Sequence, residues 1–386
     1  MKSLPSNSSL SEIFTNFLPN NQQTLFLRSC LWRGKKAAEA WANWCEIHSD
    51  TRLILKQKNI GLKGLTPLLF HNLQRNGLPI DPSLLTFFRT AQTYEEKRTK
   101  VYREICHQVL AALTTAGKRF LVVKGAALAD TAFEDPSLRH CHDLDIVLDD
   151  YDLSSTLALI SSLEFSLASK NIPSEWEKIT LIHRHGLPVC LHRGLFGLSF
   201  CNRGQQEIWN RSEKKTIADV PCQVLRPADA LLHVCGQAFF AGRSHMPTWV
   251  ADSWAIMDRF PDFPWEQLII SATRNHLALP VFVMLRFLAD QLHAPIPSTV
   301  LAALAVSSSE SLIGQELALS IARKFSSQGL REVVNKTNSW RSRLAIVKWM
   351  VFPYLDYLHW THPGTESWAI PFHYVSRPLQ YLVRRF

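Results

Sequence analysis

The sequence lacks the features that would place it in several common protein classes. No uninterrupted apolar run approaches the roughly 18 to 20 residues that a membrane-spanning helix needs, so we expect no segment to cross a bilayer. Charged residues make up only 19% of the chain and hydrophobic residues 46%, which excludes a disordered, highly charged protein. No two cysteines form a Cys-x-x-Cys pair, which argues against a zinc ribbon or a thioredoxin-like site. Internal repeats and low-complexity tracts are also absent from the sequence.

The eight cysteines that are present lie far apart, mostly among apolar neighbours. This distribution is typical of reduced thiols in a protein core. Residues Met1–Pro19 contain no continuous apolar segment and do not resemble a signal peptide. We therefore expect a cytoplasmic protein.

Basic residues exceed acidic ones, with a formal net charge of +9. Such a field attracts phosphate-bearing substrates, nucleic acid or an anionic membrane, although many basic proteins bind none of these. Near the C-terminus, Trp340–Arg343 and Lys348–Met350 interleave basic and aromatic residues. They are compatible with weak contact to nucleic acid or a membrane surface, or with an amphipathic helix whose tryptophans pack in a core.

The spacing of apolar residues along the chain changes twice. Apolar residues recur three and four apart from about residue 22 to 118, and again from Ala228 onward, which predicts helices. Between these regions, strand-like runs alternate with helical segments, which predicts a compact α+β core. We expect an N-terminal helical region at 1–118, a mixed-sheet core at 119–226 and a C-terminal helical region at 227–386. The expected strands are Phe120–Val123, Asp143–Leu148, Ile179–Arg184, Leu187–His192 and Cys222–Arg226.

Two acids spaced two residues apart mark the most informative part of this core. Asp143 and Asp145 belong to an apolar run that follows the segment Lys124-Gly125 and a helical crossing. Because side chains at i and i+2 of a strand share one face, the two carboxylates would stand side by side. Such a pair suits a hard divalent cation that shares its oxygen ligands with phosphates. The alternative for this pair alone is a solvated loop edge.

The pattern Lys124-Gly125, then Arg139-x-x-x-Asp143-x-Asp145, resembles the uncharacterised bacterial nucleotidyltransferase family of the polymerase-beta-like nucleotidyltransferase superfamily. The resemblance extends over most of the chain. It includes Leu65–Leu73, Pro227–His233, Trp249–Asp252 and Pro371–Arg377.

This resemblance implies a role for each residue of the pattern. Asp143 and Asp145 would bind Mg²⁺ or Mn²⁺, and Arg139 would bind phosphate or hold the acids in place. The triphosphate of a nucleoside triphosphate would lie on Lys124, Gly125 and Ala126, at the start of a helix. Superfamily members commonly have Gly-Ser at this turn, so the hydroxyl is missing here.

The chain departs from the family pattern at a third acid. Members usually carry a carboxylate two residues before a histidine on a later strand, and here Cys190 precedes His192 in that position. A neutral thiol is a poor Mg²⁺ ligand and a poor base. His192 or His185 could serve as the base instead. We also expect His183 and His185 to share one strand face with the site, where they contact substrate or simply bond each other.

Two other patterns near the motif carry less chemistry. His140-Cys141-His142 is only a local run, whereas a zinc site needs four convergent ligands. Asp252 is expected to cap a helix or pair with Arg243 or Arg259.

The resemblance predicts a metal-dependent enzyme that moves a nucleoside monophosphate from a nucleoside triphosphate to an unidentified acceptor and releases pyrophosphate. The acceptor could be a small molecule, a peptide, a protein or an RNA end. The alternative is a catalytically impaired member that binds a nucleotide or a partner, which Cys190 favours. A nucleic-acid or membrane-surface module is a third class, based only on net charge and the C-terminal aromatics.

Overall fold

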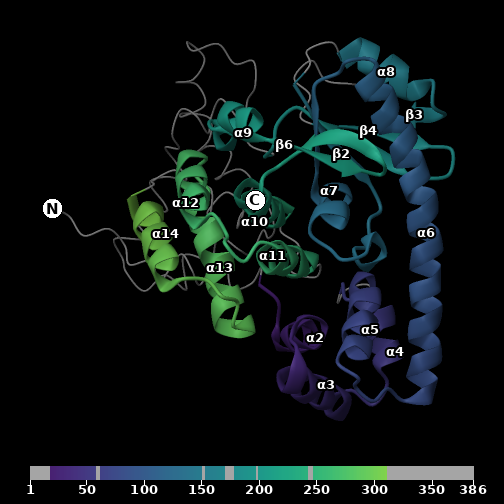
Figure 1. Ribbon diagram of the computed structural model, residues 1–386, viewed down its shortest axis with the longest axis vertical. Helices are drawn as coiled ribbons and strands as arrows, with labels where there is room; N and C mark the ends of the chain where they lie inside the picture. Colours follow the sequence, from purple (N-terminus) through teal and green to yellow (C-terminus); the bar gives the residue numbers. More distant parts are fainter. Residues whose placement is uncertain are drawn as a thin grey trace, which may run out of the picture.

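The fold is built on a seven-stranded sheet that packs against helices on both faces (Figure 1). The computed structural model of the chain describes residues 18–57, 61–149, 153–169, 178–196, 199–241 and 247–310. The sheet lies at one end, with α6 (Pro82–Thr115) packed against one of its faces, the N-terminal helices lie at the other end, and the C-terminal helices lie beside both. The predicted α+β class, a mixed-sheet core flanked by helices, is confirmed.

Three of the N-terminal helices begin at a residue whose side chain caps the first turn, namely Asn20, Asp50 and Asp81. Asn20 and Gln23 form a reciprocal capping box at the first of them. The longest helix, α6, begins after Asp81, whose side chain accepts a hydrogen bond from the Ser83 amide at 2.8 Å. It ends before Gly117, whose φ of +66° suits glycine. The elements are α2 (Asn21–Leu31), α3 (Gly34–Ile47), α4 (Thr51–Lys56), η3 (Lys63–Leu65), α5 (Thr66–Arg75) and α6 (Pro82–Thr115).

The sheet is mixed and has the strand order β3-β4-β5-β2-β1-β7-β6. At its centre β2 pairs antiparallel with β1 and parallel with β5. Its strands are β1 (Phe120–Val123), β2 (Leu144–Leu148), β3 (Phe165–Leu167), β4 (Lys178–His183), β5 (Pro188–His192), β6 (Glu213–Ile217) and β7 (Val220–Val224). Connecting them are α7 (Lys124–Thr131), η4 (Pro136–Leu138), α8 (Leu153–Ser161), η5 (Ser199–Asn202) and α9 (Gln205–Arg211).

Side-chain alternation along the strands divides the sheet into two faces. Val122, Ile146 and Leu191 belong to the apolar cluster that includes α6 and α7 residues. Leu121 and Val147 belong instead to the cluster that includes the C-terminal helices. Asp145 shares this second face with Val147, so the candidate site lies on the side of the sheet toward those helices.

The helical regions before and after the sheet share one apolar core. Trp32 Nε1 donates a hydrogen bond to the Leu292 carbonyl at 2.8 Å, and Arg28 Nε donates one to the Gln291 carbonyl at 2.9 Å. The C-terminal helices are α10 (Pro227–Ala241), α11 (Thr248–Arg259), α12 (Trp265–Arg274), α13 (Ala278–Leu292) and α14 (Ser298–Glu310). None of the helices in the described ranges combines the length and apolarity needed to cross a bilayer.

All five predicted strands are present, with shifts of one or two residues at their ends. The short edge strands β3 and β6 were not predicted. The C-terminal segments Trp340–Arg343, Lys348–Met350 and Pro371–Arg377 lie outside the described residues.

Candidate metal and nucleotide site

Asp143, Asp145 and Cys190 converge at the centre of the sheet. Asp145 lies in β2, 2% exposed, and is paired in register with Cys190 of the parallel strand β5. Asp143 directly precedes β2 and is half-buried. One ligand atom from each of the three lies within 4.8 Å of the others. The two carboxylates fit a divalent cation, and the thiol adds a softer donor.

Two cationic or imidazole side chains approach Asp145. Lys124 Nζ lies 2.7 Å and His192 Nε2 lies 2.6 Å from Asp145 Oδ1. Burial alone would raise the pKa of Asp145, but the hydrogen bond from His192 and the Lys124 charge together hold that pKa well below its usual value. Asp145 is therefore a carboxylate at neutral pH.

His192 is neutral in this environment. Burial lowers the pKa of its imidazole, and the nearby Lys124 lowers it further, although the hydrogen bond to Asp145 opposes both effects. The sequence showed no orienting partner for His192, and the structure supplies one in Asp145. Because Nε2–H donates to the Asp145 carboxylate, the neutral imidazole can accept a proton at Nδ1.

The turn from β1 into α7 places Lys124, Gly125 and Ala126 beside Asp145. Lys124 has a φ of +57°, a conformation that is uncommon for a residue with a side chain. Gly125 does not need a positive φ, but a Cβ at this position would lie 2.8 Å from Cys141 Sγ. The packing of Cys141 therefore gives Gly125 a structural reason besides the predicted approach of phosphate.

Arg139 is paired with Asp252 of α11. The guanidinium donates to both carboxylate oxygens, at 2.5 Å from Nε and 2.8 Å from Nη2, and both side chains are largely buried. Asp252 thus pairs with Arg139 rather than with Arg259, because Arg139 lies opposite it across the helix–loop interface. The other expected partner, Arg243, lies outside the described residues. In this position Arg139 ties the segment before β2 to the C-terminal helices.

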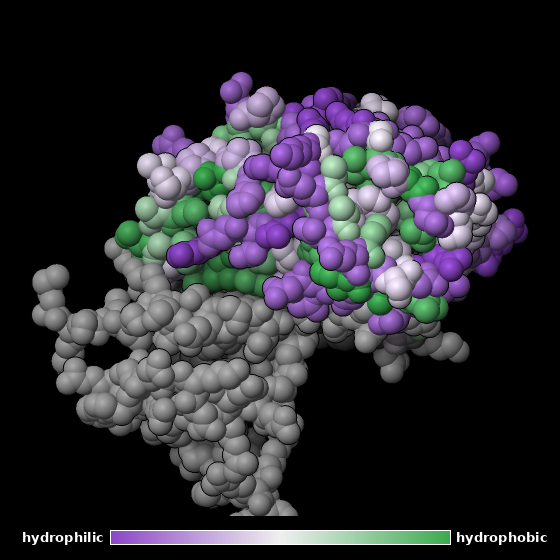
Figure 2. All heavy atoms as spheres, turned by 90° about the horizontal axis from the view of Figure 1, so that it is seen from below, coloured by the Kyte–Doolittle hydropathy of each residue, from purple (hydrophilic) through white to green (hydrophobic). Residues whose placement is uncertain are grey.

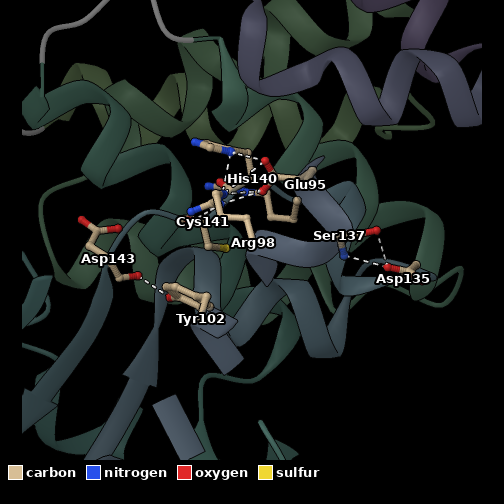
Figure 3. A network of polar contacts seen from close by, with 9 residues as sticks. Glu95, Arg98, Tyr102, Asp135, Ser137, His140, Cys141 and Asp143 are labelled. Atoms are coloured by element: carbon tan, nitrogen blue, oxygen red, sulfur yellow. Dashed lines mark hydrogen bonds and ion pairs between the residues drawn. The ribbon is translucent and has the colours of Figure 1, made fainter. Parts of the chain in front are cut away.

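Helix α6 holds the segment before β2 from the other side (Figure 3). Tyr102 Oη donates a hydrogen bond to the Asp143 carbonyl at 2.5 Å, and Arg98 donates one to the Cys141 carbonyl. Arg98 also pairs with Glu95, which His140 Nδ1 approaches to 2.9 Å. Glu95, which belongs to the charged run Glu95-Glu96-Lys97-Arg98, is thus buried.

His140-Cys141-His142 does not form a zinc centre. His140 contacts Glu95, whereas His142 Nε2 lies 3.7 Å from Asp143 Oδ2. Within the described part of the chain, only the Asp143–Asp145–Cys190 group brings three such side chains together. The two imidazoles of this run therefore have different partners.

His183 does not face the site. It follows the alternation of Ile179 and Leu181, which lie in the cluster under α6, whereas Thr180 faces Cys190 with Oγ1 3.9 Å from Sγ. The rings of His183 and His185 contact each other, with centroids 5.1 Å apart. The expectation that His183 shares a face with the site is wrong. His183 is three residues from Thr180 in β4, so the two side chains point to opposite faces of the sheet.

Two residues that sequence reasoning missed lie close to the site. Lys178 is opposite His192 in the β4–β5 ladder; burial would lower its pKa, but Cys190 and the two aspartates raise it overall. His233 of α10 is 3% exposed, and burial, together with the Lys124 charge, lowers its pKa to about 3. Alternation from Thr180 could have suggested Lys178 once β4 and β5 were aligned. His233 ends the segment Pro227–His233 that resembles the family, but that resemblance gave it no role.

Comparison with known proteins gives one match by family. A family model described as an uncharacterised nucleotidyltransferase matches residues 60–293, which include all of the residues named at this site. A search of curated proteins finds no match to the chain.

Proposed function

Because the chain belongs to the uncharacterised nucleotidyltransferase family, we propose that it transfers a nucleoside monophosphate from a nucleoside triphosphate to an acceptor and releases pyrophosphate. The observation that carries this proposal is the convergence of Asp143 and Asp145 beside Lys124 at the β1–α7 turn. Paired carboxylates next to a helix start and a cation match the needs of phosphoryl chemistry, in which positioning and electrostatics dominate.

Asp143 and Asp145 would hold a divalent cation, Mg²⁺ or Mn²⁺, with Cys190 beside them. When bound, this ion supplies positive charge that neutralises the triphosphate oxygens. The Lys124 ammonium, within 2.7 Å of Asp145, can reach phosphate oxygens at the same place. Gly125 and Ala126 present the first turn of α7, whose amides favour an anion.

The remaining residues would position or move protons. His192 is neutral and lies on the site face, so we assign it the role of accepting a proton from the acceptor hydroxyl. Arg139 is a positioning residue, because its guanidinium is paired with Asp252 and fixes the segment that leads into β2. Lys178 adds a second cation for the triphosphate or the leaving pyrophosphate.

The wider setting of the site follows the same proposal. We place the chain in the polymerase-beta-like superfamily, with the transferase core at 119–226 between helical regions at 1–118 and 227–386. All eight cysteines are free, which is compatible with a cytoplasmic protein. The acceptor is a small molecule, a peptide, a protein or an RNA end.

A second function is favoured by one observation. Cys190 occupies the position opposite Asp145 where a third carboxylate is expected. If a thiol cannot complete the site, the protein binds a nucleotide or a partner without turnover.

Pyrophosphate release with each of the four nucleoside triphosphates, in Mg²⁺ or Mn²⁺, tests the proposal. The wild type is compared with Asp143→Asn/Asp145→Asn and with Asp258→Asn, a control at an exposed ion pair with Arg33. Radiolabelled nucleotide with cell lysate supplies an unidentified acceptor. We expect metal-dependent release or labelling in the wild type and the control only.

Titration calorimetry separates the two candidate functions. Nucleotide binding without turnover, in buffer and in lysate, would support the binding protein. Absence of nucleotide binding would refute the transferase and the nucleotide-binding protein, and with them the assignment of the site.

A further inference from the structure

Cys190 is placed as a ligand rather than as a core side chain. It is 2% exposed, but it is not a member of either apolar cluster, unlike its β5 neighbour Leu191. Its Sγ lies within 4.8 Å of carboxylate oxygens from Asp143 and Asp145. The thiol therefore lines a charged site instead of filling the core.

The strand register fixes this position. Cys190 and Asp145 are Cα partners on the parallel strands β2 and β5, both buried in the middle of the sheet. Neighbouring strands lie about 4.8 Å apart, so side chains of partners on one face are held close together. A cation bound by Asp145 would meet the sulfur without any change in the fold.

Burial and the two aspartates raise the pKa of the Cys190 thiol, so the thiolate forms when a bound cation displaces the proton. Two carboxylates and a thiolate carry three negative charges, while Lys124 contacts Asp145 and Lys178 lies beside Cys190. A divalent cation together with these two ammonium groups offsets that charge.

The donor atoms determine which cation binds best. Oxygen donors suit Mg²⁺, which demands near-ideal octahedral geometry and releases its water reluctantly. A thiolate instead selects softer ions such as Zn²⁺ and Co²⁺. One sulfur among three protein donors is enough to separate the two classes of ion.

We propose that Cys190 Sγ is the third protein ligand of the cation held by Asp143 and Asp145, and that the site binds thiophilic divalent cations in preference to Mg²⁺. This inference rests on the proposed function for the identity of the site, and it names the class of ion that the site takes.

Cobalt substitution of the full chain gives a direct readout of the ligand. A thiolate bound to Co²⁺ produces a charge-transfer band in the near ultraviolet. We expect the band in the wild type and in Cys222→Ala, a matched control at a buried cysteine of β7 in the apolar cluster. It should be absent from Cys190→Ala and from Asp143→Asn/Asp145→Asn. An undiminished band in Cys190→Ala would overturn the proposal.

Competition between ions tests the preference. In Cys190→Asp the third donor becomes an oxygen, so Mg²⁺ should displace Co²⁺ at a concentration at least about tenfold lower than in the wild type, a minimum for a change of direct ligand. Equal displacement in the two proteins would overturn the proposed preference. Circular dichroism confirms that each variant is folded. If Cys190→Asp does not fold, Cys190→Ala still tests the ligand, because it only removes the sulfur atom.

The two proposals fail in different ways. A Co²⁺ band that depends on Cys190, in a protein that never releases pyrophosphate, would refute the transferase and keep the ligand. Pyrophosphate release that depends on Asp143 and Asp145, with no effect of Cys190→Ala on release or on the band, would refute the ligand and keep the transferase.

Discussion

Lys124 combines backbone strain with a central position in the site. A residue with a side chain at positive φ costs on the order of 1 kcal/mol or more, and persists where surrounding contacts hold it. Here the ion pair with Asp145 and the start of α7 hold it. The conformation aims the ammonium at the carboxylate rather than at solvent.

Gly125 is explained by close packing, and this can be tested. We expect Gly125→Ala to destabilise the wild type by about 1–3 kcal/mol, because the new Cβ would lie 2.8 Å from Cys141 Sγ. In a Cys141→Ala background the sulfur is gone, and the same substitution should be neutral or stabilise the helix by up to about 1 kcal/mol. Urea unfolding of the four proteins measures the coupling. The same loss in both backgrounds would show that Cys141 is not the obstacle.

The ion pair between Arg139 and Asp252 should matter far more than a surface pair on the same helix. Asp252→Ala leaves the buried Arg139 charge without its carboxylate partner, and we expect a loss of about 3–5 kcal/mol in the free energy of unfolding. Asp258→Ala breaks the exposed pair with Arg33 and should cost less than about 1 kcal/mol. Chemical denaturation of both variants compares them, and similar losses would contradict the assignment.

Single residues also show where sequence reasoning stops. The spacing of Asp143 and Asp145 and the position of Cys190 could be predicted because strand periodicity and the family pattern are local properties. The partners of Arg139 and His192 could not, because Asp252 and Asp145 approach them only through tertiary packing.

At the scale of elements, α6 positions the strand that carries the site. Tyr102→Phe removes the hydrogen bond to the Asp143 carbonyl, and should lower stability by about 1 kcal/mol. Metal affinity should fall about tenfold, as for other groups that orient a ligand. Tyr94→Phe, at an exposed tyrosine of the same helix, is the control and should change neither. Mn²⁺ titration calorimetry and urea unfolding measure both effects; unchanged affinity in Tyr102→Phe would mean that Asp143 is held without α6.

The elements that sequence patterns missed are those with little burial. In β6, Glu213-Lys214-Lys215-Thr216-Ile217, only Ile217 is buried, and in β3 only Phe165 is buried. Edge strands contact one neighbour and carry charges that discourage further pairing, so they show neither apolar alternation nor a continuous apolar run. The central strands β1 and β2 are buried throughout and were predicted for that reason.

At the end of the molecule that carries the N-terminal helices, the surface is neither uniformly hydrophilic nor uniformly hydrophobic (Figure 2). Figure 2 shows this end, where hydrophilic side chains of the described residues surround separate hydrophobic ones. Ile47 of α3 and Leu53 of α4 are among the exposed hydrophobic residues. Scattered apolar residues of this kind are normal on a protein surface.

The stability of the whole molecule should fall in mild acid because of His233. Its folded pKa of about 3 lies below the value of about 6.5 in an unfolded chain, so the unfolded state binds more protons between these values. Stability from this group is therefore complete above about pH 6.5 and is lost as pH falls toward 3, by on the order of 4–5 kcal/mol.

His233→Gln isolates this contribution. Lys124, Asp145 and His192 all face His233 and are retained in the variant, so the difference between the two proteins belongs to His233. Urea unfolding between about pH 7 and pH 4 should show a shallower dependence in the variant. Parallel curves would contradict a buried neutral imidazole.

The arrangement of the whole molecule was the least predictable level. The sequence predicts helices on both sides of the sheet, but not that Trp32 meets the end of α13 and that the two groups share one core. Such a contact joins residues hundreds of positions apart, and neither helix carries a local mark of the other.

The single long helix α6 contacts both ends of the molecule, so the directions in which its side chains point around the helix axis must suit both ends. Phe88 packs among the N-terminal helices, whereas Tyr102 reaches the strand that bears the site. One residue inserted between them would rotate these side chains relative to each other by about 100°. Seven inserted residues would nearly restore the rotation, but they would lengthen the helix by about 10 Å and pull the N-terminal helices away from the core that they share with the C-terminal helices. The number of residues between Phe88 and Tyr102 is therefore fixed by the contacts at both ends of this segment, whichever residues occupy its surface.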